Sequence, residues 1–75
     1  MTPTETPPAR ILIVDDEANL AELLVMACRV RGWDAQGVGT GREAVALARS
    51  EHFDAIVLDV MLPDLDGFAV IEKVR

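Results

Sequence analysis

The chain has few aromatic residues, a single cysteine and no long apolar run. Its 75 residues include one Trp, two Phe and no Tyr. The lone Cys28 excludes an internal disulfide and favours a reducing compartment, and its apolar helical surroundings predict a small buried side chain. No run approaches the roughly 18 apolar residues of a membrane span, and the N-terminus has no apolar signal core. We therefore expect a cytoplasmic domain that does not contact a membrane.

Basic residues are also scarce, with 7 Lys and Arg against 13 Asp and Glu and a net charge of −6. This balance argues against a nucleic-acid surface, which requires clustered basic side chains. Six of the acids fall in two short stretches, 15–17 and 59–66. The length permits one small domain.

Short apolar runs alternate with stretches of helical spacing. Residues 1–9 carry three prolines and three threonines, and we expect a disordered tail there. Strands are predicted at 10–14, 33–38 and 55–58, and helices at about 17–31, 41–50 and from about 67 onward. Alternation of this kind predicts an α/β domain with a parallel sheet and helices on both faces.

The first predicted helix has Asp16 or Glu17 as its N-cap and Gly32 as its C′ residue. Its expected core-facing residues are Leu20, Leu23, Leu24, Ala27 and Val30. For the second helix, Thr40 and Glu43 form a capping box. Its expected inner residues are Ala44, Val45, Leu47 and Ala48.

The third predicted helix has Asp66 as its N-cap and an inner stripe of Val70, Ile71 and Val74. Strands one and three are strongly apolar, so we expect both to be buried on both faces and to lie side by side. Strand two is diluted by polar residues and glycine, which suits an edge. The predicted strand order is therefore 2-1-3, with a ligand crevice where the winding reverses between strands one and three.

Asp15, Asp16 and Asp59 follow strands one and three, at the carboxyl ends that border this crevice. Three carboxylates brought close together repel one another, and a hard divalent cation removes the conflict. Mg²⁺ prefers oxygen ligands and typically binds one or two carboxylates together with a phosphate. A carboxylate beside Mg²⁺ can also act as a nucleophile that forms an aspartyl phosphate. The residues thus predict a magnesium site with a phosphate-accepting aspartate.

The segments ILIVDDE, GREAV and IVLDVMLPDLDGF, at this separation, resemble the receiver domain of response regulators. The wording is most similar to receivers of winged-helix transcription regulators. The resemblance implies a flavodoxin-like sheet and a two-component phosphorelay in which Asp59 accepts a phosphoryl group from a histidine kinase. It also implies that Asp16, Asp59 and the backbone carbonyl of Met61 ligate Mg²⁺ directly, and that Asp15 acts through a metal-bound water.

By the same resemblance, Pro63 and Gly67 shape the loop after the acceptor. Asp64 and Asp66 match the loop pattern, and we interpret them as solvated or capping residues rather than ligands. A complete receiver has two further strand–helix units, which carry a Ser or Thr and a Lys that contact the phosphoryl group. Lys73, the only lysine, lies on the third helix and does not match that position.

We therefore expect residues 10–75 to form a partial receiver, truncated to three strands and three helices, in a signalling module that is not itself an enzyme. DNA would be contacted only through an effector domain that lies outside the chain. Strand three would then present an open edge and a bare apolar face, which predicts self-association.

Other readings remain open on the sequence alone. An aspartyl-nucleophile phosphatase would often place an acid two residues after the nucleophile, where Met61 stands. An interaction module of receiver topology would not use phosphorylation, although all three acids are retained. A flavodoxin-like cofactor binder would need a phosphate loop after strand one, and the glycine run at 37–41 matches such a loop poorly. His52 has no partner at ligand spacing and is expected to be a solvated loop residue.

Overall fold

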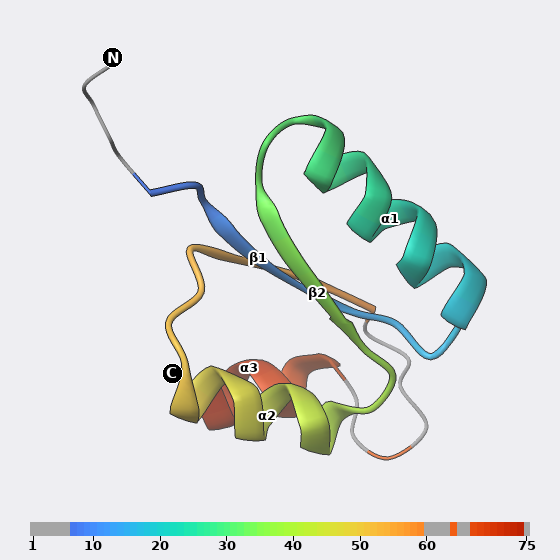
Figure 1. Ribbon diagram of the computed structural model, residues 1–75. Helices are drawn as coiled ribbons and strands as arrows, with labels where there is room; N and C mark the ends of the chain where they lie inside the picture. Colours follow the sequence, from blue (N-terminus) through green and yellow to red (C-terminus); the bar gives the residue numbers. More distant parts are fainter. Residues whose placement is uncertain (1–6, 60–63, 65–66, 75) are drawn as a thin grey trace.

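The computed structural model describes residues 7–59, Asp64 and 67–74, apart from the side chains of Phe68, Ile71 and Val74. Strands and helices alternate along the described chain (Figure 1). The elements are β1 (Arg10–Val14), α1 (Ala18–Val30), β2 (Asp34–Val38), α2 (Gly41–Ser50), β3 (Ala55–Leu58) and α3 (Gly67–Val74). Met61, Pro63 and Asp66, which the sequence singled out, lie outside the described residues. Gly67 is the first residue of α3.

The described strands form a parallel sheet in the order β2-β1-β3, which confirms the predicted order. β1 pairs with β2 from Arg10↔Asp34 to Val14↔Val38. It pairs with β3 from Ile11↔Ala55 to Val14↔Leu58. β1 is thus the central strand, and its apolar sequence suits a position that is covered on both faces.

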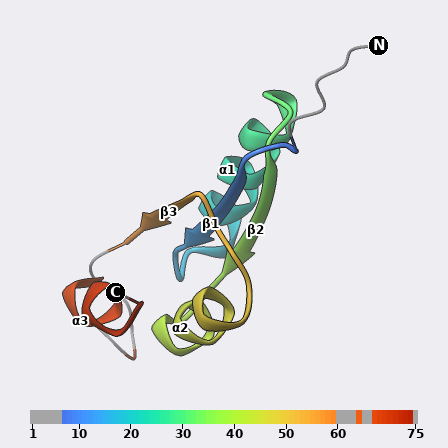
Figure 2. The same cartoon turned by 90° about the vertical axis from the view of Figure 1, so that its left-hand side faces the viewer.

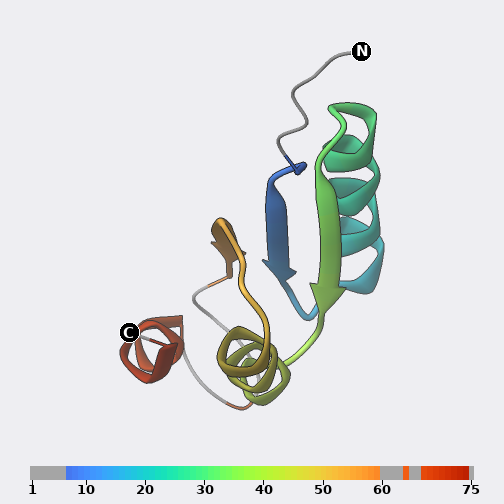
Figure 3. The same cartoon turned by 60° about the vertical axis from the view of Figure 1, so that its left-hand side comes forward.

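α1 covers one face of the sheet, and α2 and α3 lie together on the other (Figures 2 and 3). Because successive side chains of a strand point to opposite faces, β1 supplies both cores. Leu12 and Val14 pack with Ala44, Val45 and Val70 on the α2–α3 side. Ile11 and Ile13 pack with Ala21 and Ala35 on the α1 side.

The predicted inner stripe of α1 was largely wrong. Leu23 is 62% exposed and Val30 is 85% exposed. Leu24 packs against the sheet as predicted, but its companions there are Ala21, Val25 and Cys28. α1 lies close to β2, where a Cβ added to Gly37 would come within 3.5 Å of the Val25 side chain. A small side chain such as Ala21 can pack against the sheet, and the spacing of the leucines alone does not show which side of α1 does so.

Strand β3 is less buried than its composition predicted. Val57 is 47% exposed, and Ala55 is exposed as well. Ile56 and Leu58 pack against the core on the α2–α3 side. The reason is position: within the described residues β3 is an edge strand, and α1 lies over β1 and β2 rather than over β3. The expectation of burial on both faces is corrected accordingly.

The helix ends follow their sequence signals. α1 ends at Val30, and Gly32, the C′ residue after the C-cap Arg31, has a φ of +83°. The N–H groups of Gly32 and Trp33 donate to the carbonyls of Arg29 and Cys28, at 2.9 and 3.0 Å. This is the Schellman pattern that a C′ glycine permits. α2 begins after Thr40, whose hydroxyl oxygen accepts the Glu43 N–H at 3.1 Å, as predicted.

Candidate functional site

The carboxyl ends of β1 and β3 hold Asp15, Asp16 and Asp59. The β1–β2 and β1–β3 ladders extend to these residues, because Asp15 N–H donates to the Val38 carbonyl at 3.1 Å. Asp59 N–H likewise donates to the Val14 carbonyl at 2.9 Å. The sheet backbone thereby fixes two of the three acids, and it places them on neighbouring strands.

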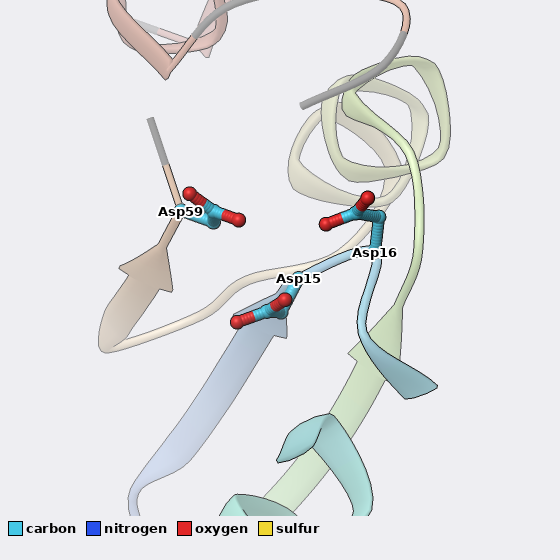
Figure 4. Close-up of side chains that lie close together, drawn as sticks. All are labelled: Asp15, Asp16 and Asp59. Carbon is cyan, nitrogen blue, oxygen red and sulfur yellow. The ribbon is translucent and has the colours of Figure 1, made fainter. Parts of the chain in front are cut away.

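The three side chains converge on a shared space. Figure 4 shows the carboxylates of Asp16 and Asp59 pointing toward each other, with Asp15 at the end of β1. One carboxylate oxygen from each residue lies within 4.8 Å of the others. Asp15 and Asp59 are half-buried and Asp16 is exposed. The sequence prediction that these acids come together is therefore correct in its geometry.

Local hydrogen bonding shapes the turn between β1 and α1. Oδ1 of Asp15 accepts the N–H of Glu17 at 2.9 Å. Glu17 is the N-cap residue of α1, although its side chain makes no capping hydrogen bond. Of the two predicted N-caps, Glu17 is therefore the one observed, and Asp16 is left at the mouth of the site.

The donor set fits a hard divalent cation. Carboxylate oxygens are the ligands that Mg²⁺ prefers, at about 2.0–2.1 Å, with waters completing its shell. Oxygens on opposite sides of such an ion are about 4 Å apart, close to the observed limit of 4.8 Å. A cation held there would offset the mutual repulsion of the acids. The cluster can therefore hold a metal ion.

The acids border an open cleft of about 450 Å³. Its other wall is apolar and includes Leu20, Leu24 and Val57, from α1 and β3. The cleft is thus charged on one side and apolar on the other, and Asp59 is among the residues that line it.

Asp64 does not join the acidic cluster. Its Oδ1 accepts the Gly41 N–H at 2.8 Å and its Oδ2 accepts the Arg42 N–H at 3.0 Å. It caps the first turn of α2, and Arg42 Nε lies 3.7 Å from Oδ2. The prediction that Asp64 is solvated or capping allowed this role without naming the helix. A contact across 23 residues leaves no local signal in the sequence.

A second charged cluster lies at the opposite, amino end of the sheet. Arg10 Nη2 donates to Glu51 Oε1 at 2.7 Å, and Arg10 Nε lies 3.4 Å from Asp34 Oδ2. The backbone N–H of Arg10 donates to Asp54 Oδ2 at 2.7 Å, and Asp54 Oδ1 contacts the exposed His52 ring at 3.1 Å. The hydrogen bond that the Arg10 guanidinium donates to Glu51 raises the pKa of Arg10. The Arg10 amide, and then His52, lower the pKa of the Asp54 carboxyl.

The glycine-rich segment and the helices have one further property each. The glycine run at 37–41 serves packing and capping: Gly37 faces α1, and Gly41 is the first residue of α2. Among the described residues, none of the helices combines the length and apolar character needed to cross a membrane.

Two curated relatives are similar to most of this chain. The probable transcriptional regulatory protein TcrX of Mycobacterium tuberculosis is 48% identical over 68 residues, which cover 91% of this chain and 29% of the relative. The DNA-binding response regulator MtrA of the same species is 39% identical over 71 residues, covering 95% and 31%. The chain thus spans about a third of the length of these curated relatives.

Two solved structures are similar to it as well. The chemotaxis response regulator CheY4 of Vibrio cholerae is 32% identical with a TM-score of 0.88, covering 91% of this chain and 57% of that one. The response regulator TrrA of Thermotoga maritima, solved in complex with Mg²⁺ and BeF, is 34% identical with a TM-score of 0.84, covering 89% and 58%.

The family described as the response regulator receiver domain matches residues 11–75. Its match includes both strands that carry the acids, and the relatives are transcriptional regulatory proteins. The chain belongs to the response regulator receiver domain family.

Proposed function

We propose that Asp59 is the acceptor of a phosphoryl group and that Asp15 and Asp16 complete its metal-dependent site. The observation that carries this proposal is the convergence of three carboxylates, with oxygens within 4.8 Å of one another, at the ends of two adjacent parallel strands. The carboxyl end of such a sheet, where the winding reverses, is the usual ligand crevice. The sheet fixes the Asp59 backbone, and the cleft leaves the side chain accessible.

Asp16, Asp59 and the backbone carbonyl of Met61 would hold Mg²⁺ directly, and Asp15 would act through a water. Bound there, Mg²⁺ would offset the charge of the acids and of the incoming phosphoryl oxygens. The solved complex of TrrA with Mg²⁺ and BeF supports this assignment by analogy. Pro63 and Gly67 would shape the loop that carries Met61.

The chemistry that this chain contributes is nucleophilic. A carboxylate oxygen of Asp59 attacks the phosphorus of a phosphohistidine on a histidine kinase. The new P–O bond forms as the P–N bond breaks, and the electron pair leaves with the imidazole nitrogen, which takes up a proton. Such transfer depends mainly on positioning and charge compensation. Asp15 and Asp16 would serve both needs.

Residues 10–75 would act as the receiver portion of a cytoplasmic signalling protein rather than as an enzyme in its own right. We propose that two further strand–helix units complete the flavodoxin-like domain, and that residues 1–9 form a tail. Transcription would be controlled through a DNA-binding effector domain outside this chain. The DNA-binding relative MtrA supports that assignment by similarity.

The edge of β3 would also allow this chain to associate with itself. Val57 is half-exposed there, and Leu20 and Leu23 on α1 add apolar surface on the same side of the sheet. An open strand edge beside apolar surface is a template for pairing with another chain. A sharp monomeric mass by light scattering at tens of micromolar, with protected β3 amides, would rule this out.

A phosphorylation assay tests the main proposal. The chain is incubated with acetyl phosphate with and without Mg²⁺, and intact mass is recorded for the wild type, Asp59→Asn and Glu17→Gln. Glu17 is the matched control, since it is an acid beside the site but outside the cluster. We expect one phosphoryl group on the wild type and on Glu17→Gln, only with Mg²⁺, and none on Asp59→Asn. Labelling of Asp59→Asn equal to the wild type would refute the assignment.

A further inference from the structure

We infer that Asp64 is a positioning residue for the acidic site, which it couples to the start of α2. Asp64, five residues after Asp59, accepts hydrogen bonds from the first backbone amides of α2. Metal binding at the acidic site and the conformation of this helix terminus therefore depend on each other. The inference deepens the proposed function and rests on it.

The Asp64 carboxylate makes two hydrogen bonds to the backbone of α2. Each oxygen of the Asp64 carboxylate accepts one backbone N–H, from Gly41 at 2.8 Å and from Arg42 at 3.0 Å. The first amides of a helix have no partner within the helix, and negative charge is favourable at this end of the dipole. The Asp64 side chain is 19% exposed, whereas that of Arg42 is 83% exposed. The two hydrogen bonds from backbone N–H groups therefore hold the Asp64 carboxylate more firmly than its ion pair with the exposed Arg42 side chain does.

The position of Asp64 in the sequence connects these hydrogen bonds to the acidic site. Asp59 is tied to β1 through its N–H and the Val14 carbonyl, at 2.9 Å. Five residues later, Asp64 is tied to α2. Asp59 and Asp64 are therefore each held by hydrogen bonds to a different element of the fold. Groups that are already fixed in place have less conformational freedom to lose when a ligand binds, so anchoring the chain at Asp64 favours metal binding at Asp59.

A plain stabilising cap is the alternative, and the chain contains a matched control for it. Thr40 caps the same helix end locally, where its hydroxyl oxygen accepts the Glu43 N–H at 3.1 Å. Loss of the Thr40 cap would weaken α2 without touching the connection to Asp59. If Asp64 were only a cap, its removal and the removal of the Thr40 hydroxyl would have the same effect on the acidic site.

The experiment is a Mg²⁺ titration followed by amide NMR on the wild type, Asp64→Ala, Asp64→Asn and Thr40→Ala. In the wild type, the Gly41 and Arg42 amides should shift with the same midpoint as those of Asp15, Asp16 and Asp59. Groups that orient metal ligands typically change affinity by about 10- to 100-fold when removed. We expect Asp64→Ala to weaken Mg²⁺ binding by roughly tenfold, the lower end of that range. Asp64→Asn should weaken it less, and Thr40→Ala should leave it within about twofold, since that residue orients no ligand.

Equal affinity in the wild type and the Asp64 variants would overturn the inference, and so would equal weakening by Thr40→Ala. If Asp64→Ala does not fold, Asp64→Asn and the wild-type shifts of Gly41 and Arg42 decide the matter. Failure of the proposed function has a different signature. In that case the wild type itself shows no saturable Mg²⁺ shifts at Asp59, and both proposals fall before any Asp64 variant is compared.

Discussion

The two ends of the sheet handle charge in opposite ways. At the amino end, Arg10 stands among Glu51, Asp34 and Asp54, and its guanidinium also lies 4.8 Å from the centre of the Phe53 ring. At the carboxyl end, three acids of like charge converge, with oxygens within 4.8 Å. The same strands, β1 and β3, connect the two clusters.

At the amino end the guanidinium of Arg10 pairs with Glu51 and Asp34, and its backbone N–H donates to Asp54, so opposite charges meet there. That arrangement joins β1 to β2 and to the segment before β3. The carboxyl end instead concentrates negative charge, an arrangement that costs stability unless a cation binds. We propose that the amino end serves the fold and that the carboxyl end serves function. The predictions below set the two ends against each other, beginning with the largest expected effect.

Mg²⁺ should stabilise the chain through the carboxyl end alone. A ligand at about 100 times its Kd raises the free energy of unfolding by about 2.7 kcal/mol when it binds only the folded state. We expect thermal unfolding of the wild type to shift upward with Mg²⁺, and Asp16→Asn to lose most of that shift. Glu22→Gln, an acid on α1 outside the cluster, is the control. An equal shift in all three proteins would mean that Mg²⁺ acts elsewhere.

Arg10→Ala should lower stability without altering Mg²⁺ affinity. The change removes the ion pairs with Glu51 and Asp34 and the contact with Phe53. We expect the midpoint of thermal unfolding to fall by a few degrees. Arg31→Ala is the matched control, because it also removes an arginine that lies over an aromatic ring. The Arg31 guanidinium is 5.6 Å from the centre of the Trp33 ring and is not part of the Arg10 cluster. A change in Mg²⁺ affinity as large as that of Asp16→Asn would contradict the division between the two ends.

Asp54 should give the amino end an acid-dependent stability. Its pKa is lowered in the folded state by the Arg10 amide and by His52. The contribution of the carboxylate is therefore present above its unfolded pKa, about 3.9, and is lost as the pH falls through the lower folded value. We expect the stability gap between the wild type and Asp54→Asn to narrow over that acidic range. Chemical unfolding at a series of pH values measures it, and a gap that widens toward acid would refute the assignment.

Added salt should have the smallest effect, with a separate signature at each end. Raising ionic strength from about 0.01 M to 1 M shortens the screening length from about 30 Å to 3 Å. We expect the stability gap between the wild type and Arg10→Ala to shrink, while the apparent Mg²⁺ affinity falls. Paired unfolding and Mg²⁺ titrations at both salt levels measure the two effects. A gap that is unchanged by salt would assign the role of Arg10 to packing on Phe53 instead.

Local signals in the sequence predicted most of the fold. The apolar runs at 10–14 and 55–58, the Thr40 cap and the Gly32 terminus each depend on neighbours within a few residues. The meeting of Asp15 with Asp59 also followed, because parallel strands bring their carboxyl ends to one edge. Those features are fixed by backbone preference and strand direction.

The predictions that were wrong or missing depend on how the elements pack against one another. The sheet-facing side of α1 was misjudged because the spacing of its leucines does not show which side of the helix packs on the sheet; Ala21, Val25 and Cys28 lie there. The exposure of Val57 follows from the edge position of β3. The hydrogen bond between Asp64 and the Gly41 N–H joins residues 23 positions apart, and only the assembled fold brings them together. The predicted roles of Met61 and Pro63 fall outside the described residues and remain predictions.

The most direct test of the central claim is to follow every amide of the chain by NMR during a Mg²⁺ titration, in the wild type and in Asp59→Asn. We predict saturable shifts with one midpoint at Asp15, Asp16 and Asp59, almost none at Arg10 and Asp54, and much weaker binding in the variant. Shifts of similar size at both ends of the sheet, or a variant that binds Mg²⁺ as tightly as the wild type, would contradict the claim that the carboxyl end is the functional one.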